Sequence, residues 1–418
     1  MSRHPRSTSR LSPTRTRPRR LPDRKTAPPQ LAARVSARAA SSPEITMNAA
    51  VPTADVAAAE PVKFAPGIYF GVPEDKYHQD TSLGSTKLKE LVIDPIEYQH
   101  GRLHGAEQKE TFQLKWGRAI HCRALEGKQF LCERFPIAPS LADYPKALVT
   151  MDHLRDHAKK LGLTKIGNTK ALVATAIREF DQTIPIWDEI MARFENEHAG
   201  KTIIPREAIE HIERAVEWMQ REPKLAPVME GGTFTAGASE VSIFYEENGV
   251  RLKARIDHLL SHAVVDLKSF RPFLQERLRE GAKKAISRMR YDLQAAAYIR
   301  ALKVAAKLFA EGKIFDCPYS PAFLESVFAA LKVAERDPRS EEALKWVWVL
   351  IKASGAPQPV VAEFDLGSMI FRQAAVDIDD AIKNYRLYVE KFGLDQDWVP
   401  EIPAEVWGDT DFPSWAFT

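Results

Sequence analysis

The sequence predicts an α/β fold in which strands and helices surround one core. The hydrophobic pattern has a two-residue period over residues 236–270 and a helical period over 275–311, and a second strand pair is expected between 346 and 366. Of the 418 residues, 44% are hydrophobic and 28% charged, as in a globular protein. No apolar run approaches the about 18 residues of a membrane span, so membrane insertion is excluded.

The first 60 residues differ in composition from the rest of the chain. They are rich in Arg, Ser, Thr, Pro and Ala and hold almost no aromatic residue, which predicts a disordered basic tail. Residues 1–46 carry ten Arg and one Lys against two acids, so the remainder is acidic overall. A transit peptide or a nucleic-acid-binding tail would have such a start. A solvated tail, or an upstream extension of a gene whose natural start is Met47, is the simpler interpretation.

Residues 61–418 are predicted to form the folded domain. A short strand is expected at 67–70, a helix from residue 85 to the residue before Pro95, and another helix at about 108–126. Helical patterns without strand signals over 140–230 indicate a helical insertion. Within it, a helix pair near 150–178 resembles the DNA-binding SAP module, although a solvated helical hairpin explains it equally well. A further amphipathic helix is expected at about 368–391.

The three cysteines, Cys122, Cys132 and Cys317, are too few for a disulfide framework or for a four-thiolate metal site. A reducing, cytoplasmic environment is therefore expected.

Asn248-Gly249 is the strongest hairpin signal in the chain, because a type I′ turn needs positive φ at both central positions. If these residues form the loop, Asp257 faces Glu240 across the hairpin. A second loop at Ser261-His262 would set Asp266 opposite Asp257. Three acids on adjacent strands would then lie on one face of the sheet, about 4.5–5.5 Å apart per opposed pair.

A row of like charges in a sheet requires compensation, and a divalent cation supplies it. Carboxylate oxygens suit Mg²⁺ or Mn²⁺, and two such ions can activate water and stabilise a leaving oxygen in phosphodiester cleavage. Lys268 would share the face of Asp266 by the two-residue period and add positive charge. Each acid alone is more often a solvated surface residue, and a register slip of one residue would separate them. Two independent turns that align three acids favour the site.

Asp266-Leu267-Lys268 after an apolar strand, preceded by Ala-Arg-Ile-Asp257 and an earlier acid, resembles the PD-(D/E)xK nuclease core of RecB-like exonucleases. The resemblance implies a restriction-endonuclease-like core, with a central mixed sheet flanked by helices. In this chain Ile256 stands where the family has proline. The iron–sulfur cysteines of some relatives are absent.

Two helices extend this resemblance. The segment from Trp116 to Glu126 is similar to the family's first helix, which implies that His121 ligates metal, together with Asp257, Asp266 and the Leu267 carbonyl. Tyr291, Gln294 and Tyr298 are similar to the family's Gln-x-x-x-Tyr helix, which implies contacts with the DNA strand or with the catalytic Lys268. Without the motif, these would be read as packed or solvated helix residues.

Residues 66–98 resemble more specifically the exonuclease VIII, or RecE-type, branch found in phages and prophages. This resemblance implies a 5′→3′ exonuclease on linear double-stranded DNA, a single-strand annealing recombinase as partner in homologous recombination, and a ring-like homo-oligomer. Lys283 and Lys284 belong to a basic cluster that follows the active strand and are candidate DNA contacts, although an exposed basic helix is the ordinary interpretation.

Two other function classes remain open. One is a noncatalytic DNA-binding or recombination-assembly protein that retains the nuclease fold. The other is a sugar hydrolase with paired carboxylates, which would explain neither Lys268 nor His121.

Overall fold

The computed structural model describes residues 62–105, 111–272, 276–401 and 405–412. The predicted basic tail, residues 1–60, lies outside the described residues. The division of the chain into a tail, a nuclease domain and an insertion stays a prediction.

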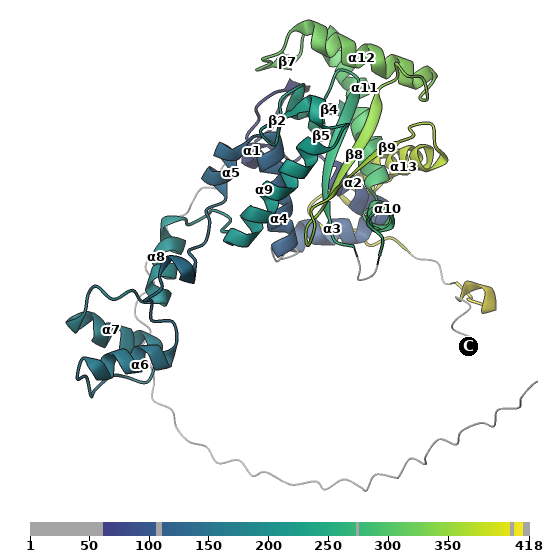
Figure 1. Cartoon of the computed structure of the whole chain (residues 1–418). Helices are drawn as coiled ribbons and strands as arrows, with labels where there is room; N and C mark the ends of the chain where they lie inside the picture. The colour runs from purple at the N-terminus through teal and green to yellow at the C-terminus, as the bar shows by residue number, and fades with distance from the viewer. Residues whose placement is uncertain (1–61, 106–110, 273–275, 402–404, 413–418) are drawn as a thin grey trace, which may run out of the picture. The chain divides into compact units, whose positions relative to one another are not determined.

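A mixed sheet of seven strands forms the centre of the fold, in the order β7-β1-β4-β5-β6-β8-β9 (Figure 1). All neighbours pair antiparallel except β6 with β8 and β1 with β7, which are parallel. A small separate sheet pairs β2 with β3. The strands are β1 (Gly67–Tyr69), β2 (Met229–Glu230), β3 (Thr233–Phe234), β4 (Ala238–Glu247), β5 (Val250–Leu259), β6 (Ala263–Phe270), β7 (Ile314–Phe315), β8 (Lys345–Lys352) and β9 (Pro359–Phe364).

Thirteen α-helices occur in the part of the chain that the structure describes. They are α1 (Glu74–Gln79), α2 (Ser85–Ile93), α3 (Pro95–His104), α4 (Phe112–Leu125), α5 (Lys128–Arg134), α6 (Met151–Lys160), α7 (Lys170–Phe180), α8 (Trp187–Glu197), α9 (Arg206–Arg221), α10 (Leu278–Arg288), α11 (Tyr291–Ala310), α12 (Pro321–Arg336) and α13 (Met369–Phe392). The α/β class predicted from the sequence is confirmed. None of these helices is long and apolar enough to cross a membrane.

Two hydrophobic layers cover the two faces of the sheet. Helices α2, α11, α12 and α13 pack on one face, and α4, α5 and α9 pack on the other (Figure 1). Strand β6 shows the expected alternation, because Val264 and Phe270 belong to the first layer whereas Val265 and Leu267 belong to the second. Asp266 and Lys268 therefore share the face of α11.

The predicted hairpin is confirmed at its turn and in its register. Asn248 and Gly249 have φ values of 52° and 78°, as a type I′ turn requires, and Glu247 pairs with Val250. The predicted strand pair near the C-terminal end is also present, as antiparallel β8 and β9.

Side-chain caps fix the starts of several helices. The carboxylate of Asp94 accepts hydrogen bonds from the backbone N–H groups of Ile96 and Glu97 at 2.8 and 3.2 Å, before Pro95 in the first turn of α3. Thr111 and Ser368 cap α4 and α13 in the same way. The predicted helix over 275–311 is interrupted, because Arg290 takes a left-handed φ of 49° between α10 and α11.

Helices α6 to α9 occupy the segment in which the sequence predicts a helical insertion. Helices α6 and α7 share a small hydrophobic cluster of their own, which includes Leu154, Val173 and Ile177. Helix α9 instead packs in the layer that holds α4. The likeness of the α6–α7 pair to a SAP module stays a prediction.

Candidate active site

The central hairpin brings Glu240 and Asp257 to facing positions. The flanking residue pairs of β4 and β5 have the predicted register on both sides of this position. The ladder pair of Glu240 with Asp257 is not formed, and Glu240 has a φ of 57°. Positive φ is uncommon for a residue with a side chain, and such conformations concentrate at functional sites.

Strands β5 and β6 part next to Asp257. Their ladder ends at His258 opposite Val265, in the predicted register. The next pair, Asp257 with Asp266, is not formed, because the backbone N–H of Leu267 donates to Asp257 Oδ2 at 2.8 Å instead. The prediction of directly opposed carboxylates is therefore wrong in this detail, since a side chain takes the place of a strand partner.

Lys268 lies between the two aspartates. Its Nζ is 2.7 Å from Asp266 Oδ1, 3.8 Å from Asp257 Oδ2 and 3.2 Å from the Leu267 carbonyl oxygen. Burial acts to lower the pKa of Lys268, but the two carboxylates outweigh burial and raise it. Lys268 is therefore an ammonium ion at neutral pH and a donor of hydrogen bonds.

Asp266 is the most enclosed of the acids, with 1% of its side chain exposed. Burial raises its pKa, the charge of Lys268 opposes this, and Asp257 adds to it. Its Oδ1 accepts hydrogen bonds from Lys268 and, at 3.0 Å, from Gln294 Nε2. Its Oδ2 is buried and has no hydrogen-bond partner among the described residues. Such an orphaned oxygen is unfavourable, and a bound cation would satisfy it.

Helix α11 supplies the side chains predicted from the Gln-x-x-x-Tyr pattern. Gln294 contacts Asp266 directly, and the ring of Tyr291 lies 5.3 Å from Lys268 Nζ. Tyr298 is buried, with its ring 6.1 Å from that of Trp346. The structure thus brings Gln294 and Tyr291 to the acids, whereas Tyr298 is mainly a core residue.

Helix α4 presents His121 from the other layer. His121 Nδ1 lies 3.8 Å from Asp257 Oδ2, and 28% of the His121 side chain is exposed. Burial lowers its pKa, and the nearby Asp257 opposes this shift. The ring is therefore neutral at neutral pH, which is the form that binds metal ions.

Arg255 contacts the site, although it is not among the site residues predicted from the sequence. Its guanidinium forms an ion pair with Glu240, donates to the Val72 carbonyl at 3.0 Å and lies 5.3 Å from the ring of Tyr77. Burial raises the pKa of Glu240, Arg255 opposes this, and Asp257 adds to it. The sequence could have indicated this contact. Arg255 lies two residues before Asp257 on the same predicted strand, and residues two apart on a strand share a face.

The donors fit a hard divalent cation, in that they are carboxylate and carbonyl oxygens with one imidazole. The residues are Asp257, Asp266, His121 and the Leu267 carbonyl, with Glu240 near them. Within the described ranges, however, the side chains of His121, Glu240, Asp257 and Asp266 do not place three ligand atoms within 4.8 Å of one another. The ammonium of Lys268 fills the space between the two aspartates.

A cleft of about 1500 Å³ opens onto this site. His121, Glu240, Asp257, Lys268 and Gln294 line it, whereas Asp266 lies beneath and is not among the lining residues. Tyr291, Tyr298, Arg271, Lys284 and Arg288 line the cleft as well. The groups that the sequence predicts for chemistry therefore share one accessible space.

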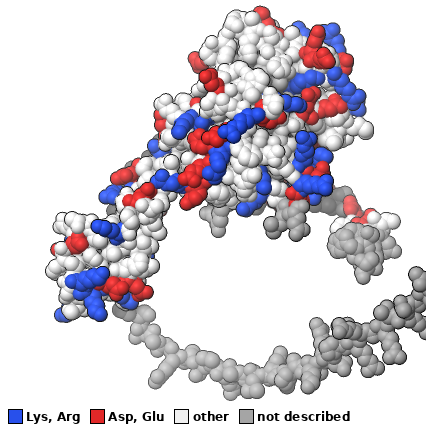
Figure 2. Space-filling model, in the orientation of Figure 1, with Lys and Arg blue, Asp and Glu red and all other residues white. Residues whose placement is uncertain are grey.

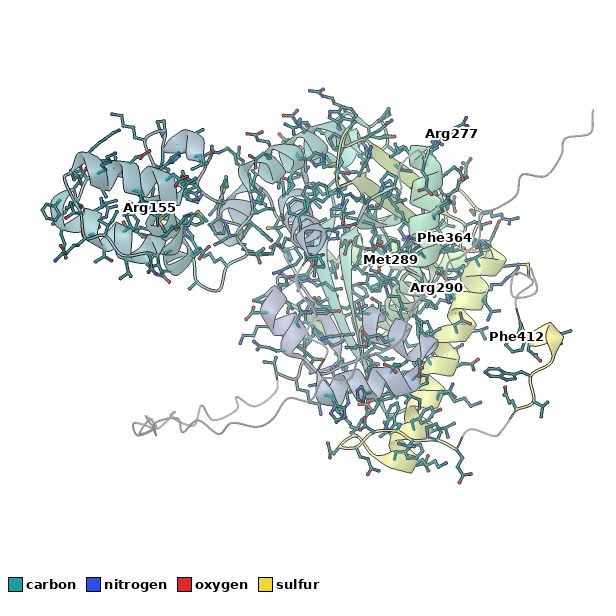
Figure 3. All side chains as sticks on the ribbon, turned by 90° about the horizontal axis from the view of Figure 1, so that it is seen from below. Arg155, Arg277, Met289, Arg290, Phe364 and Phe412 are labelled. Atoms are coloured by element: carbon teal, nitrogen blue, oxygen red, sulfur yellow. The ribbon has the colours of Figure 1, made fainter. Side chains whose placement is uncertain are left out.

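The two predicted DNA-binding lysines differ in position. Both lysines are exposed. Lys284 lines the cleft and pairs with Glu276, whereas Lys283 pairs with Glu280 and does not line the cleft. Arg277 and Arg290 flank the two ends of α10 (Figure 3), and Arg290 is paired with two aspartates. On the face shown in Figure 2, basic and acidic side chains are interspersed.

Comparison with known proteins gives one informative match. A family model described as a PDDEXK-like domain of unknown function (DUF3799) matches residues 84–315, more than half of the chain. No curated protein matches. Among solved structures, the chain is similar to a "Putative exonuclease" from Eubacterium rectale at 12% identity, with 64% of this chain and 93% of that chain covered and a TM-score of 0.28. At this TM-score the similarity supports no conclusion about fold or function. The family match extends from the start of α2 to β7 and includes the whole site.

Proposed function

The chain belongs to this family of PDDEXK-like domains and has the PD-(D/E)xK nuclease fold, and from this premise we propose that it is a Mg²⁺-dependent exodeoxyribonuclease acting on linear double-stranded DNA. One observation carries the proposal. Asp266 is buried with an oxygen that lacks a partner, and Lys268 stands between it and Asp257 at the base of the cleft. A merely structural ion pair would not need a second acid beside it.

Asp257, Asp266, His121 and the Leu267 carbonyl would hold the metal, and Glu240 would bind it directly or through water. When bound, Mg²⁺ or Mn²⁺, in one or two ions, supplies activation of water and stabilisation of the leaving oxygen. Asp266 and Asp257 must be ionised to bind the metal. Their proposed role is therefore that of metal ligands and not of general acids.

Lys268 stays protonated, so its role is to stabilise charge at the scissile phosphate and to orient the attacking water by donating a hydrogen bond. It is not a general base. Gln294 holds Asp266 Oδ1 in position from α11. Tyr291 would contact the DNA strand from the same helix, whereas the buried Tyr298 would support that helix from the core.

The finer assignment rests on the resemblance of residues 66–98 to the RecE-type branch. It comprises 5′→3′ polarity, a role in phage or prophage recombination with a single-strand annealing recombinase, and homo-oligomerisation. The proposed cytoplasmic location rests instead on the small number of cysteines.

A nuclease time course tests the proposal. Purified protein with Mg²⁺ is expected to degrade linear duplex DNA, to release a 5′ label before a 3′ label, and to stop when a chelator is added. Asp266→Ala and Lys268→Ala should be inactive. Lys345→Ala is the matched control, because Lys345 is a partly buried, ion-paired lysine on the neighbouring strand β8. Full activity of Asp266→Ala and Lys268→Ala would refute the assignment.

DNA binding has a separate test with a built-in control. Lys284→Glu, at the cleft, is expected to weaken binding to duplex DNA and to flatten its salt dependence by about one phosphate contact. Lys283→Glu, one residue away but outside the cleft, should have a smaller effect. An unchanged salt slope for both variants would exclude this helix from the DNA surface.

A noncatalytic DNA-binding or recombination-assembly role is the second candidate. It is favoured by one observation. Lys268 fills the space between the acids, and no three of the proposed side-chain ligands lie within 4.8 Å of one another in the described residues. Under this alternative the protein binds DNA, and neither Mg²⁺ nor the chelator changes the DNA length.

A further inference from the structure

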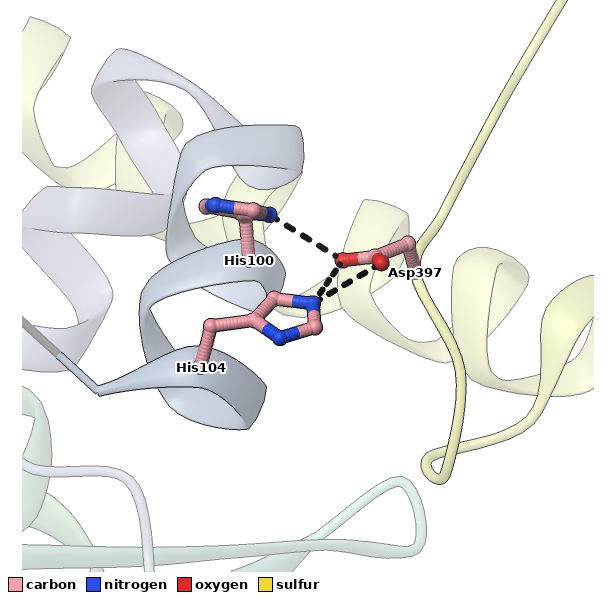
Figure 4. A group of neighbouring side chains, drawn as sticks. All are labelled: His100, His104 and Asp397. Atoms are coloured by element: carbon pink, nitrogen blue, oxygen red, sulfur yellow. Dashed lines mark hydrogen bonds and ion pairs between the residues drawn. The ribbon is translucent and has the colours of Figure 1, made fainter. Parts of the chain in front are cut away.

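A second group of metal-ligating side chains lies apart from the acidic site. His100 and His104 are four residues apart on α3, so their rings share one helical face. Both rings direct a nitrogen at the carboxylate of Asp397 (Figure 4). His100 Nδ1 is 3.3 Å from Asp397 Oδ1, and His104 Nε2 is 3.2 Å from Oδ1 and 2.9 Å from Oδ2.

The backbone on both sides of Asp397 is anchored. Before it, the buried amide of Gln99 donates to the carbonyls of Leu394 and Gln396 at 2.9 and 2.7 Å. After it, Trp398 is fully buried, and its indole N–H donates to the Gly393 carbonyl at 2.9 Å. Asp397 is thus held over α3 by its neighbours, independently of the two histidines.

Trp398 also packs against α3 and α13. Its ring lies 6.1 Å from that of Tyr98 on α3 and 5.0 Å from that of Tyr388 on α13. Gln99 and Tyr98 directly precede His100, so the helix turn that carries the first histidine is part of the same contact. The three side chains are exposed, but buried packing holds together the two backbone segments that carry them.

From this geometry we propose that His100, His104 and Asp397 bind a zinc ion. One ligand atom from each of these three residues lies within 4.8 Å of the other two, a spacing met by no other group of His, Cys, Asp and Glu in the described ranges. Two imidazoles and one carboxylate are a known donor set for Zn²⁺ in open sites, where solvent supplies the fourth ligand. Mg²⁺ prefers oxygen ligands, so this site and the acidic site select different metals.

The proposed ion would act as a clip. Asp397 is separated from His104 by 293 residues along the chain, and it follows α13 whereas the histidines belong to α3. A metal bound in the folded state only stabilises that state by mass action. The zinc ion would therefore tie the segment after α13 to α3 and raise the resistance to unfolding without entering the nuclease reaction.

Thermal unfolding of the full chain, freed of metal with a chelator and desalted, tests the proposal with Zn²⁺ alone as the probe. Zinc at about 100 times its Kd is expected to raise the Tm by roughly 3–4 °C. Competition with a chromogenic chelator should give one tight zinc ion per chain. Both effects should persist in Asp266→Ala, where the acidic site is damaged.

His104→Ala and Asp397→Asn should lower the zinc affinity by more than about 100-fold, since loss of a ligand costs at least as much as loss of a group that only orients one. Asp397→Asn keeps the shape of the side chain, so its metal-free Tm separates misfolding from loss of binding. His262→Ala, an exposed histidine outside the cluster, is the matched control and should bind zinc normally. Mg²⁺-dependent DNA degradation should be unchanged in His104→Ala.

Two results would overturn the proposal. One is a wild-type Tm that does not respond to zinc. The other is a zinc response that survives in both His104→Ala and Asp397→Asn, or that is lost only in Asp266→Ala, because the ion would then reside at the acids. Failure of the nuclease assay would leave the zinc result untouched, since the two sites share no residue.

Discussion

Replacing Lys268 by Met tests the electrostatic account of the site, because methionine is similar in length and flexibility but carries no charge. In the variant, Asp266 keeps Gln294 as a partner for Oδ1, and its Oδ2 still has none. Asp257 remains nearby with its negative charge. The two acids are then left in a buried site without the cation that separates them.

The magnitude follows from the burial of the pair. Removing one partner of a buried ion pair costs about 3–5 kcal/mol. Protonation of Asp266 limits this loss, because its pKa is already raised by burial and rises further without Lys268. The native variant then holds a proton that the unfolded chain releases at lower pH, so its stability falls as pH rises through the folded-state pKa. We expect a loss of about 3 kcal/mol near pH 8, smaller by roughly 1.4 kcal/mol near pH 7 and constant below that, because the pKa of Asp266 is already raised to about 7 in the wild type.

Urea unfolding of chelator-treated protein at about pH 6 and about pH 8 measures this loss, and repetition with Mg²⁺ measures its rescue. Mg²⁺ should stabilise Lys268→Met more than the wild type, because the cation restores positive charge between the acids, while nuclease activity stays low. Lys345→Met, which removes a partly buried lysine from β8, should show neither the pH-dependent loss of stability nor the rescue by Mg²⁺. A Lys268→Met variant with equal stability at both pH values and no response to Mg²⁺ would refute the reasoning.

Three further outcomes are expected. Burial lowers the pKa of His258 to about 4, so the unfolded chain takes up a proton before the folded chain does, and stability is lost as pH falls from about 6.5 to about 4. In acid unfolding curves, His258→Gln should remove about 3 kcal/mol of this pH dependence. Gly237→Ala should destabilise the fold by more than about 2 kcal/mol in denaturant melts, because φ is 92° and the new Cβ would lie 2.4 Å from a backbone carbonyl oxygen. Gly101→Ala in α3 is the control and should be neutral or stabilising, because its new Cβ would meet no atom within 4 Å. Gln294→Ala should slow DNA degradation by about 10- to 100-fold with the fold retained by circular dichroism, since it frees the carboxylate of Asp266; an unchanged rate would remove Gln294 from the site.

The register of the three central strands could be predicted because local chemistry sets it. Asn248-Gly249 permits a two-residue turn that few other pairs allow, and once the turn is fixed the pairing of β4 with β5 follows by counting. The same counting gives the pairing of β5 with β6 from the loop at Ser261-His262. Glu240, Asp257 and Asp266 therefore reach one region of the fold as a consequence of two short turns.

The opening of the ladder after His258 could not be predicted in this way. It depends on the Leu267 N–H donating to the Asp257 carboxylate instead of to a strand partner. Only the tertiary structure brings this charged acceptor within reach. The left-handed φ of Glu240 is equally invisible, because a glutamate has no intrinsic preference for that region. Both departures occur at the acids, where a regular sheet would place like charges directly opposite each other.

Counting the charges at the site explains the role of Arg255. Glu240, Asp257 and Asp266 carry three negative charges when ionised, whereas Lys268 and Arg255 carry two positive ones. Arg255 is paired with Glu240, so the excess negative charge belongs to the two aspartates that share Lys268. A divalent cation would therefore be drawn to that pair first. Arg255 pairs with Oε2 of Glu240, so Oε1 could bind the metal directly or through a water molecule while Arg255 holds the side chain in place.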